Sequence, residues 1–264
     1  MGDTDSPCYR PQQDVVIPPR TCRTLDLRDA FGDLEHVMPA AERPRLVAWA
    51  GTYWGTGKSE RLRLTCDRGG IGEKELVRGG GAQSSWKGKD YMKELGSARF
   101  CPQPRGIAGA LTHLVSSGLS NVTIASLCPV DPGRRCTSPS RRTLEIMLRV
   151  KPQLTPGWSP RVNDAIYAGC IPVFTAEGTH YPFPTLLDWT KLSIRLLPTD
   201  LDRIEEILGA IPIEQVEEIQ RNLMLVREGF LYASDEKPED ELDRRGPMFW
   251  ALHEAGMKLG MEYP

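Results

Sequence analysis

The chain has 264 residues, of which 40% are hydrophobic and 26% are charged, and its formal net charge is −2. A chain of this length can bury a core as one large domain or two small ones. The near-neutral charge predicts no basic field for nucleic acid or an anionic membrane, so we expect neither partner. No apolar stretch approaches 18 residues and the first residues lack a signal peptide's pattern, so we expect no membrane segment here.

Residues 1–44 contain several prolines and little periodicity. We predict that they form an extended lead-in or the remnant of an N-terminal domain. Short apolar runs then alternate with loops rich in Gly and Ser, which is typical of buried strands and their connections. The predicted elements are a strand at 45–50, helices at 59–64 and 90–95, and a strand at 98–101 that Pro102 and Pro104 end.

Residues 110–156 differ from the rest of the chain because Ser, Arg and Pro are frequent and no steady period occurs. We interpret this stretch as a disordered or weakly packed insertion. The remainder of 45–264 is then predicted to be one domain.

The signals for secondary structure become stronger from residue 157 onward. Ser159 and Pro160 match a helix N-cap followed by proline at the first helical position, and Gly169 can end this helix. Alternation of helices with strands predicts an α/β fold with a parallel sheet, in which ligands bind beyond the carboxyl ends of the strands. The further predicted elements are strands at 171–174 and 192–196 and helices at 200–210, 213–232 and 247–259.

The cysteines and paired aspartates do not indicate a metal centre. The seven cysteines include no C-x-x-C pair, so we expect no structural zinc site, while one or two disulfides stay possible. Asp200 and Asp202 have the Asp-x-Asp form of a metal site, but they open an amphipathic helix. We therefore predict that these two carboxylates cap the helix and bind no metal.

One glycine-rich turn, Gly55-Thr-Gly-Lys-Ser59, resembles the end of a phosphate-binding P-loop. The complete motif requires glycine where this chain has Thr52, which argues against an NTPase. The turn can still hold a diphosphate with its backbone N–H groups. A plain turn with Lys58 and Arg61 in solvent is the remaining alternative.

A second motif lies at the start of the helix predicted after Ser159. Arg161 adds a guanidinium group to the free N–H groups of this helix end, which favours an anionic ligand. Asp164 lies three residues further on the same side and can accept hydrogen bonds from a ribose. It can equally stabilise the helix dipole and pair with Arg161, and the spacing does not decide between these roles.

Several spaced motifs follow one another in a fixed order. They are Trp49-Ala-Gly51 with Arg61, Phe100-Cys101 with Pro104-Arg-Gly106, Ser159-Pro-Arg161, Gly169-Cys-Ile-Pro-Val173, Pro182-Phe183 and Leu187-Asp-Trp189. In this order they resemble the exostosin family, glycosyltransferase family 47. The resemblance covers about 1–106 and 157–232, roughly two thirds of the chain.

This resemblance implies a GT-B fold, of which the chain would form the C-terminal, Rossmann-like half that binds a nucleotide sugar. The implied activity is inverting, metal-independent transfer from a UDP-sugar to a glycan hydroxyl in the Golgi lumen. The UDP-sugar is the donor substrate, and no cofactor is implied. The resemblance also implies that a general base from an N-terminal domain would be missing, so we expect little or no transferase activity from this chain alone.

The same resemblance assigns residues to donor binding, while the catalytic residues stay unassigned. Asp164 stands where the family has Glu, which is one methylene longer. The alternatives to a transferase are a non-catalytic glycan- or nucleotide-sugar-binding fragment and, less favoured, a P-loop NTPase. The implied donor-binding residues are Gly51, Arg61, Arg105, Gly106, Ser159, Arg161, Asp164 and Glu177.

Overall fold

The computed structural model describes residues 11–19, 21, 23–49, 88–103, 160–175, 179–233 and 245–261, and the structural statements below concern these residues. The predicted helix at 59–64, the glycine-rich turn at 55–59 and the predicted insertion at 110–156 lie outside them.

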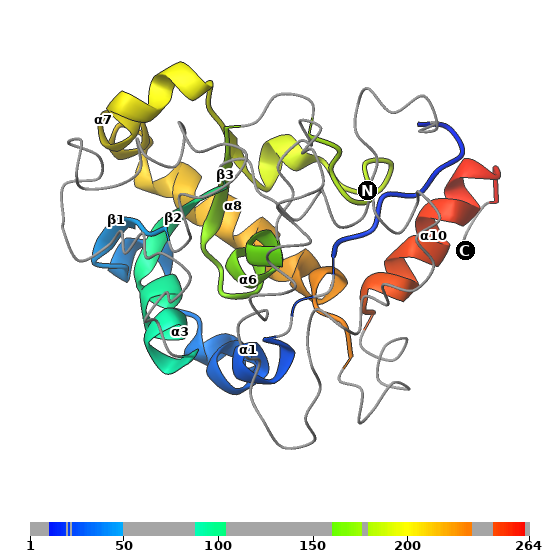
Figure 1. The fold of residues 1–264 in the computed structure, drawn as a ribbon, viewed down its shortest axis with the longest axis horizontal. Coiled ribbons are helices and arrows are strands. Elements are labelled where there is room, and N and C mark those ends of the chain that lie inside the picture. The colour runs from blue at the N-terminus through cyan, green and yellow to red at the C-terminus, as the bar shows by residue number, and fades with distance from the viewer. Residues whose placement is uncertain are drawn as a thin grey trace, which may run out of the picture.

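A parallel four-stranded sheet forms the centre of the molecule (Figure 1). The strands are β1 (Arg45–Val47), β2 (Ala98–Gln103), β3 (Ile171–Phe174) and β4 (Ile194–Arg195), and they lie side by side in chain order. Every pair is parallel, with Phe100 opposite both Val47 and Ile171. Strand β3 is buried at every residue, as expected for a central strand covered on both faces. The predicted α/β fold with a parallel sheet is confirmed.

Strand β2 continues through Pro102 to Gln103, so the prediction that Pro102 ends it was wrong. The carbonyl of Phe100 accepts a hydrogen bond from Ala48 N–H, so Phe100 directs its backbone polar groups toward β1. Pro102, two residues on, directs its backbone the same way. Because the ladder with β1 ends at the pair Val47–Phe100, the missing N–H of proline removes no ladder hydrogen bond.

Helices flank this sheet. Helices α6 and α8 both contact β3, α3 contacts β2, and α7 contacts β1. In Figure 1, α10 lies at the right-hand side of the molecule, next to the segment at 11–19. The α-helices are α1 (Thr24–Phe31), α3 (Gly88–Ser97), α6 (Pro160–Tyr167), α7 (Ile204–Gly209), α8 (Ile213–Val226) and α10 (Pro247–Lys258). The 3-10 helices are η1 (Leu34–His36), η2 (Ala40–Glu42), η5 (Trp189–Lys191), η6 (Pro198–Arg203) and η7 (Arg227–Phe230).

Most predicted elements after residue 157 are present, but two of the predicted helices are each divided into an α-helix and a 3-10 helix. The helix predicted at 200–210 begins as the 3-10 helix η6, where Asp200 N–H bonds to Leu197 O, and continues as α7. The Asp200 carboxylate accepts Leu197 N–H at 2.8 Å, which confirms the predicted capping role of Asp200. The helix predicted at 213–232 likewise ends as α8 at Val226 and gives way to η7.

Part of the stretch at 1–44, for which we predict an extended lead-in or the remnant of an N-terminal domain, is helical. Helix α1 forms within it, and its residues Leu27 and Phe31 are buried in the same core as the sheet. The segment before α1 is held by Phe183 N–H, which donates to Val16 O, and by the Lys258 ammonium, which donates to the carbonyls of Pro11 and Asp14. The described residues before β1 therefore pack against the sheet, its helices and α10.

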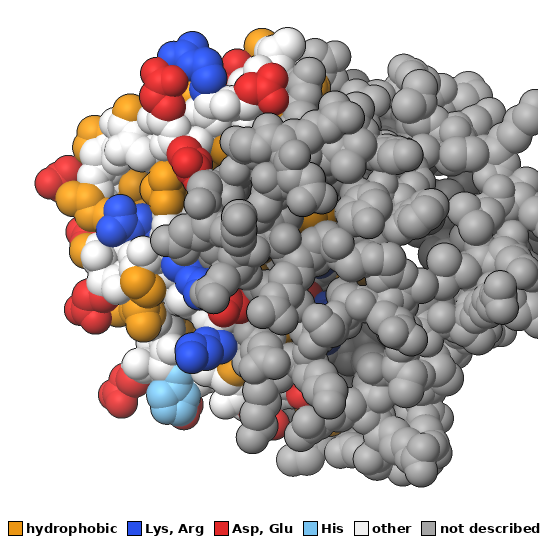
Figure 2. All heavy atoms as spheres, turned by 60° about the vertical axis from the view of Figure 1, so that its left-hand side comes forward, with side chains coloured by type: hydrophobic (Ala, Val, Ile, Leu, Met, Phe, Trp, Pro, Cys, Tyr) orange, Lys and Arg blue, Asp and Glu red, His pale blue; other side chains and the backbone are white. Residues whose placement is uncertain are grey.

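The surface seen in Figure 2 carries acidic and basic side chains interspersed over the described residues. Among the described atoms of this face, neither sign forms a broad patch. Within the described helices, none combines the length and the apolar character that crossing a bilayer requires.

Candidate functional site

The carboxyl ends of β1 and β2 meet the N-terminal end of α6 at one edge of the sheet. This is the edge at which parallel α/β sheets bind ligands, because loops and helix starts converge there. Trp49 follows β1, Gln103 ends β2 and Arg161 lies in the first turn of α6, and all three line a small hollow. Tyr91 and Glu94, both from α3, complete its polar lining.

Arg161 supplies a positive charge at this edge. Its side chain is partly buried, and loss of hydration lowers its pKa because burial disfavours the charged form. Arg23 lies near enough to lower this pKa further, whereas Asp164 acts in the opposite direction. The charges of Arg23, Arg161 and Asp164 therefore act on one another at this edge of the sheet.

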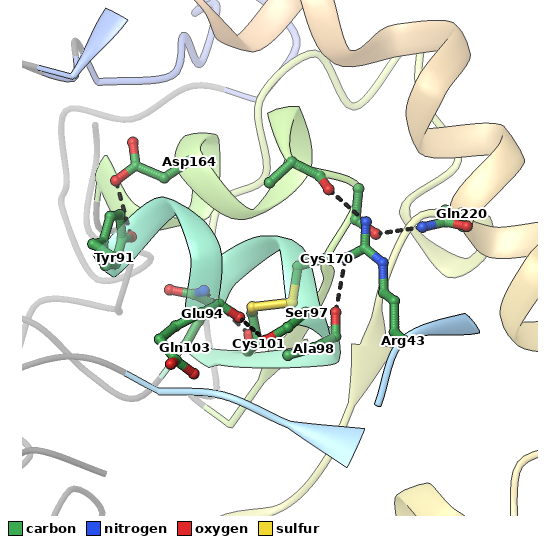
Figure 3. The surroundings of a disulfide bond; sticks show 12 residues. Arg43, Tyr91, Glu94, Ser97, Ala98, Cys101, Gln103, Asp164, Cys170 and Gln220 are labelled. Carbon is green, nitrogen blue, oxygen red and sulfur yellow. Dashed lines mark hydrogen bonds between the residues drawn. A yellow bond between two sulfur atoms is a disulfide. The ribbon is translucent and has the colours of Figure 1, made fainter. Parts of the chain in front are cut away.

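Asp164 is completely buried on α6 and accepts hydrogen bonds from three protein groups. Thr21 Oγ1 donates to Oδ1 at 2.8 Å. Arg23 Nη1 and the Tyr91 hydroxyl both donate to Oδ2, at 3.1 and 3.0 Å. Figure 3 shows the contact between Tyr91 and Asp164 beside the disulfide. These partners give Asp164 a structural role, and its contact with a ribose stays a prediction.

Tyr91 connects this carboxylate to the hollow. Burial raises the pKa of the Tyr91 hydroxyl, and the negative charge of Asp164 raises it further. The phenol therefore stays protonated and donates its proton to Asp164. The guanidinium of Arg23 lies 4.5 Å from the centre of the Tyr91 ring, which adds a cation–π contact to the same cluster.

A disulfide joins the two central strands next to the hollow (Figure 3). Cys101 of β2 is bonded to Cys170, the residue before β3, and both are buried. Cys101 also lines the hollow. The bond therefore fixes the end of α6 relative to the strand that ends at Gln103.

The C-terminal end of α6 is also held by Arg43, which is only 1% exposed. Its guanidinium donates to three carbonyls, Met38 O at 2.9 Å, Ala98 O at 2.7 Å and Ala168 O at 2.6 Å. Burial lowers the pKa of Arg43 to about 10. The three bonds connect the residues before β1, the start of β2 and the end of α6, so this buried cation organises the scaffold under the site.

The structure therefore brings together two of the residues predicted for donor binding, Arg161 and Asp164, at the expected helix. The sequence analysis did not assign Trp49 or Gln103 to the site, although Trp49 lies next to the end of the strand predicted at 45–50 and Gln103 is the last residue of β2. Their position next to a strand end was the available signal. The other predicted residues, Gly51, Arg61, Arg105, Gly106, Ser159 and Glu177, lie outside the described residues.

Comparison with known proteins finds that part of this chain matches one protein family. The exostosin GT47 domain model matches residues 129–211, which include α6, β3 and β4. A "Probable glucuronosyltransferase" of Oryza sativa subsp. japonica is 32% identical over 85 residues, covering 31% of this chain and 20% of the relative. The "Probable glucuronoxylan glucuronosyltransferase IRX7" of Arabidopsis thaliana is 35% identical over 66 residues, covering 25% and 15%.

Residues 129–211 are therefore similar to the exostosin GT47 domain. A "Probable glycosyltransferase" of Arabidopsis thaliana matches this chain at 33% identity over 101 residues, covering 38% of the chain and 21% of the relative. The chain thus spans about a fifth of the length of the curated relatives it matches. Its parallel sheet with flanking helices agrees with the C-terminal half of a GT-B fold. The family match begins at 129, within the predicted insertion at 110–156, whose nature stays a prediction.

Proposed function

We propose that this chain binds a UDP-sugar at the carboxyl edge of its sheet, as the donor-binding part of a glycosyltransferase acting on a glycan hydroxyl. The observation that carries the proposal is the position of Arg161 in the first turn of α6, at that edge and beside Arg23. The names of the relatives, which are glucuronosyltransferases and a glycosyltransferase, support the same class of reaction.

In the proposed mechanism Arg161 and the free N–H groups of α6 hold the diphosphate. Negative charge grows on the UDP leaving group as the glycosidic bond breaks, and fixed positive groups stabilise that charge. This chemistry needs no metal, and inversion at the sugar carbon follows from direct attack by the acceptor hydroxyl. Gly51, Arg61, Arg105, Gly106, Ser159 and Glu177 remain candidates for further donor contacts. The general base remains unassigned.

We further propose that the protein works in the lumen of the secretory pathway, with the Golgi as the specific compartment. The buried disulfide between Cys101 and Cys170 supports an oxidising compartment, because such bonds persist there and are rare in the cytosol. The plant relatives of the same family support a biosynthetic role. The acceptor would be a growing glycan.

Titration of UDP into the full chain by calorimetry tests donor binding. Arg161→Ala is expected to weaken UDP binding by about tenfold to a hundredfold, because it removes a charge-assisted contact to the diphosphate. Arg221→Ala, which changes an exposed arginine of α8, is the matched control and should leave UDP affinity unchanged. Equal UDP affinities for wild type and Arg161→Ala would refute the proposed site.

A further inference from the structure

Among the uncharged side chains that line the hollow, two buried polar atoms have no hydrogen-bond partner in the part of the chain that the structure describes. They are Nε1 of Trp49 and Oε1 of Gln103, and both residues are only 3% exposed. Trp49 follows β1, Gln103 ends the neighbouring strand β2, and both line the same hollow as Arg161. Buried groups without partners are uncommon because they lose their hydration without compensation, so two of them in one hollow point to a ligand.

Each of the two atoms has a defined hydrogen-bonding role, one as a donor and the other as an acceptor. Trp49 Nε1–H can only donate a hydrogen bond. The Gln103 amide has a defined orientation because its Nε2 donates to the carbonyl of Cys101 at 3.1 Å. Its Oε1 is therefore the acceptor that remains, and rotating the amide to exchange the two atoms would break that bond. Trp49 and Gln103 together offer one donor and one acceptor.

A hydroxyl group fits this pair because it donates one hydrogen bond and accepts others, and because it is about as small as a water molecule. A carboxylate cannot donate to Gln103 Oε1, and an ammonium group cannot accept from Trp49. Glu94 also lines the hollow, where it forms an ion pair with Arg45. Its carboxylate further disfavours a second negative charge at this position.

We propose that Trp49 and Gln103 together bind one hydroxyl of the sugar that the donor carries, and so select which sugar is transferred. This inference rests on the proposed function, in which Arg161 holds the diphosphate. The sugar is bonded directly to the second phosphate, so a sugar hydroxyl lies next to the phosphate-binding guanidinium that lines the same hollow. Trp49 and Gln103 contact the sugar and leave the nucleotide to Arg161.

The test compares two ligands on each variant of the full chain. Calorimetry measures the dissociation constants of UDP and of the tightest-binding member of a panel of UDP-glucose, UDP-galactose, UDP-xylose and UDP-glucuronic acid. Gln103→Met removes the acceptor, and Trp49→Phe removes the donor. Each is expected to weaken UDP-sugar binding by about fivefold to twentyfold while UDP affinity stays within about twofold. Arg161→Ala is expected to weaken both ligands.

Matched controls separate this role from a general effect on the fold. Trp250→Phe removes another buried indole N–H without a partner among the described residues, packed against Phe183 away from the hollow. Gln215→Met changes an exposed glutamine of α8. Both controls should leave the ratio of the two dissociation constants unchanged, and a variant that merely unfolds loses UDP as well.

The remaining outcomes count against the inference. Equal loss of UDP and UDP-sugar in Gln103→Met and Trp49→Phe would overturn it, since the residues would then support the fold or the nucleotide. The inference would also be overturned if neither variant changed either dissociation constant. The hollow would then be assigned to water alone. If UDP binds wild type but no UDP-sugar does, the inference fails and donor-nucleotide binding survives. If UDP itself does not bind, the proposed function fails and the inference fails with it.

Discussion

The hydrogen-bond partners of Asp164 could not be predicted from the residues next to it in the sequence. The spacing on the predicted helix allowed a ribose contact or a pair with Arg161. The structure instead joins the carboxylate to Thr21, Arg23 and Tyr91, which lie 143, 141 and 73 residues away in the chain. Because the carboxylate is fully buried, these donors replace the hydration that it loses on folding.

Replacing Asp164 by Asn tests this role. Asp164→Asn keeps the shape, removes the charge and places an amide N–H group opposite donors that need an acceptor. We expect the free energy of unfolding to fall by about 2 kcal/mol, the scale of a lost hydrogen bond to a charged group. Urea unfolding measures it, with Glu218→Gln on the exposed side of α8 as the control. A loss no larger than that of the control would show that the cluster does not stabilise the fold.

At the scale of elements, the turn from α6 to β3 determines where the site lies. Gly169 ends α6 with a φ of +70°, as its position in the sequence predicted. Cys170 N–H returns to Ala165 O, and the Gly169 carbonyl accepts from Gln220 Nε2 at 3.0 Å. The turn therefore connects the helix that carries Arg161 to α8 as well as to the sheet.

Gly169→Ala is expected to destabilise the protein for two reasons. A side chain disfavours a positive φ, and the new Cβ would lie 2.9 Å from Val37 Cγ1 and 3.0 Å from Arg43 Nη2. Gly260 has a φ of +72°, and a Cβ added there would meet no described atom within 4 Å, so Gly260→Ala isolates the backbone effect. We expect losses of about 1 kcal/mol for Gly260→Ala and about 2–3 kcal/mol for Gly169→Ala in urea unfolding. Equal losses of unfolding free energy in the two variants would show that the close contacts of the new Cβ at residue 169 do not add to the backbone effect.

Strand β2 shows where a reliable local rule fails. Proline ordinarily interrupts a ladder because it lacks an N–H group. Pro102 is tolerated because its nitrogen is on the side of β2 where β1 has already ended. Whether the missing donor matters depends on which strands are paired and on where each neighbouring strand ends.

At the scale of the whole molecule, a disulfide and side-chain hydrogen bonds between residues far apart in the chain hold the segments around the site together. Cys101 and Cys170 close a loop across a sequence separation of 69 residues. The buried guanidinium of Arg43 and the amide of Gln220 connect the residues before β1 to the sheet and to α6. These links fix the geometry at the carboxyl edge of the sheet, since each of them joins segments far apart in the chain.

Removing the disulfide measures the contribution of the covalent link. The double variant Cys101→Ser and Cys170→Ser is expected to lose about 4 kcal/mol of unfolding free energy, because the unfolded chain regains the entropy of a long loop. Chemical unfolding of oxidised wild type against the variant gives the difference, and reduced wild type should match the variant. A loss below about 1 kcal/mol would argue that the unfolded state is already compact in this region.

The sequence by itself determined the parallel α/β character, the helix that begins near Ser159 and ends at Gly169, and the position of Arg161 at its start. These features depend on interactions within a few residues, namely hydrophobic periodicity, capping and glycine conformation. Only the tertiary structure decided that Cys101 pairs with Cys170, that α1 packs into the core, that Asp164 binds Thr21, Arg23 and Tyr91, and that Trp49 and Gln103 share a hollow. Each of these results from strands and helices meeting across long sequence separations, and local patterns carry no information on which distant segments will be neighbours.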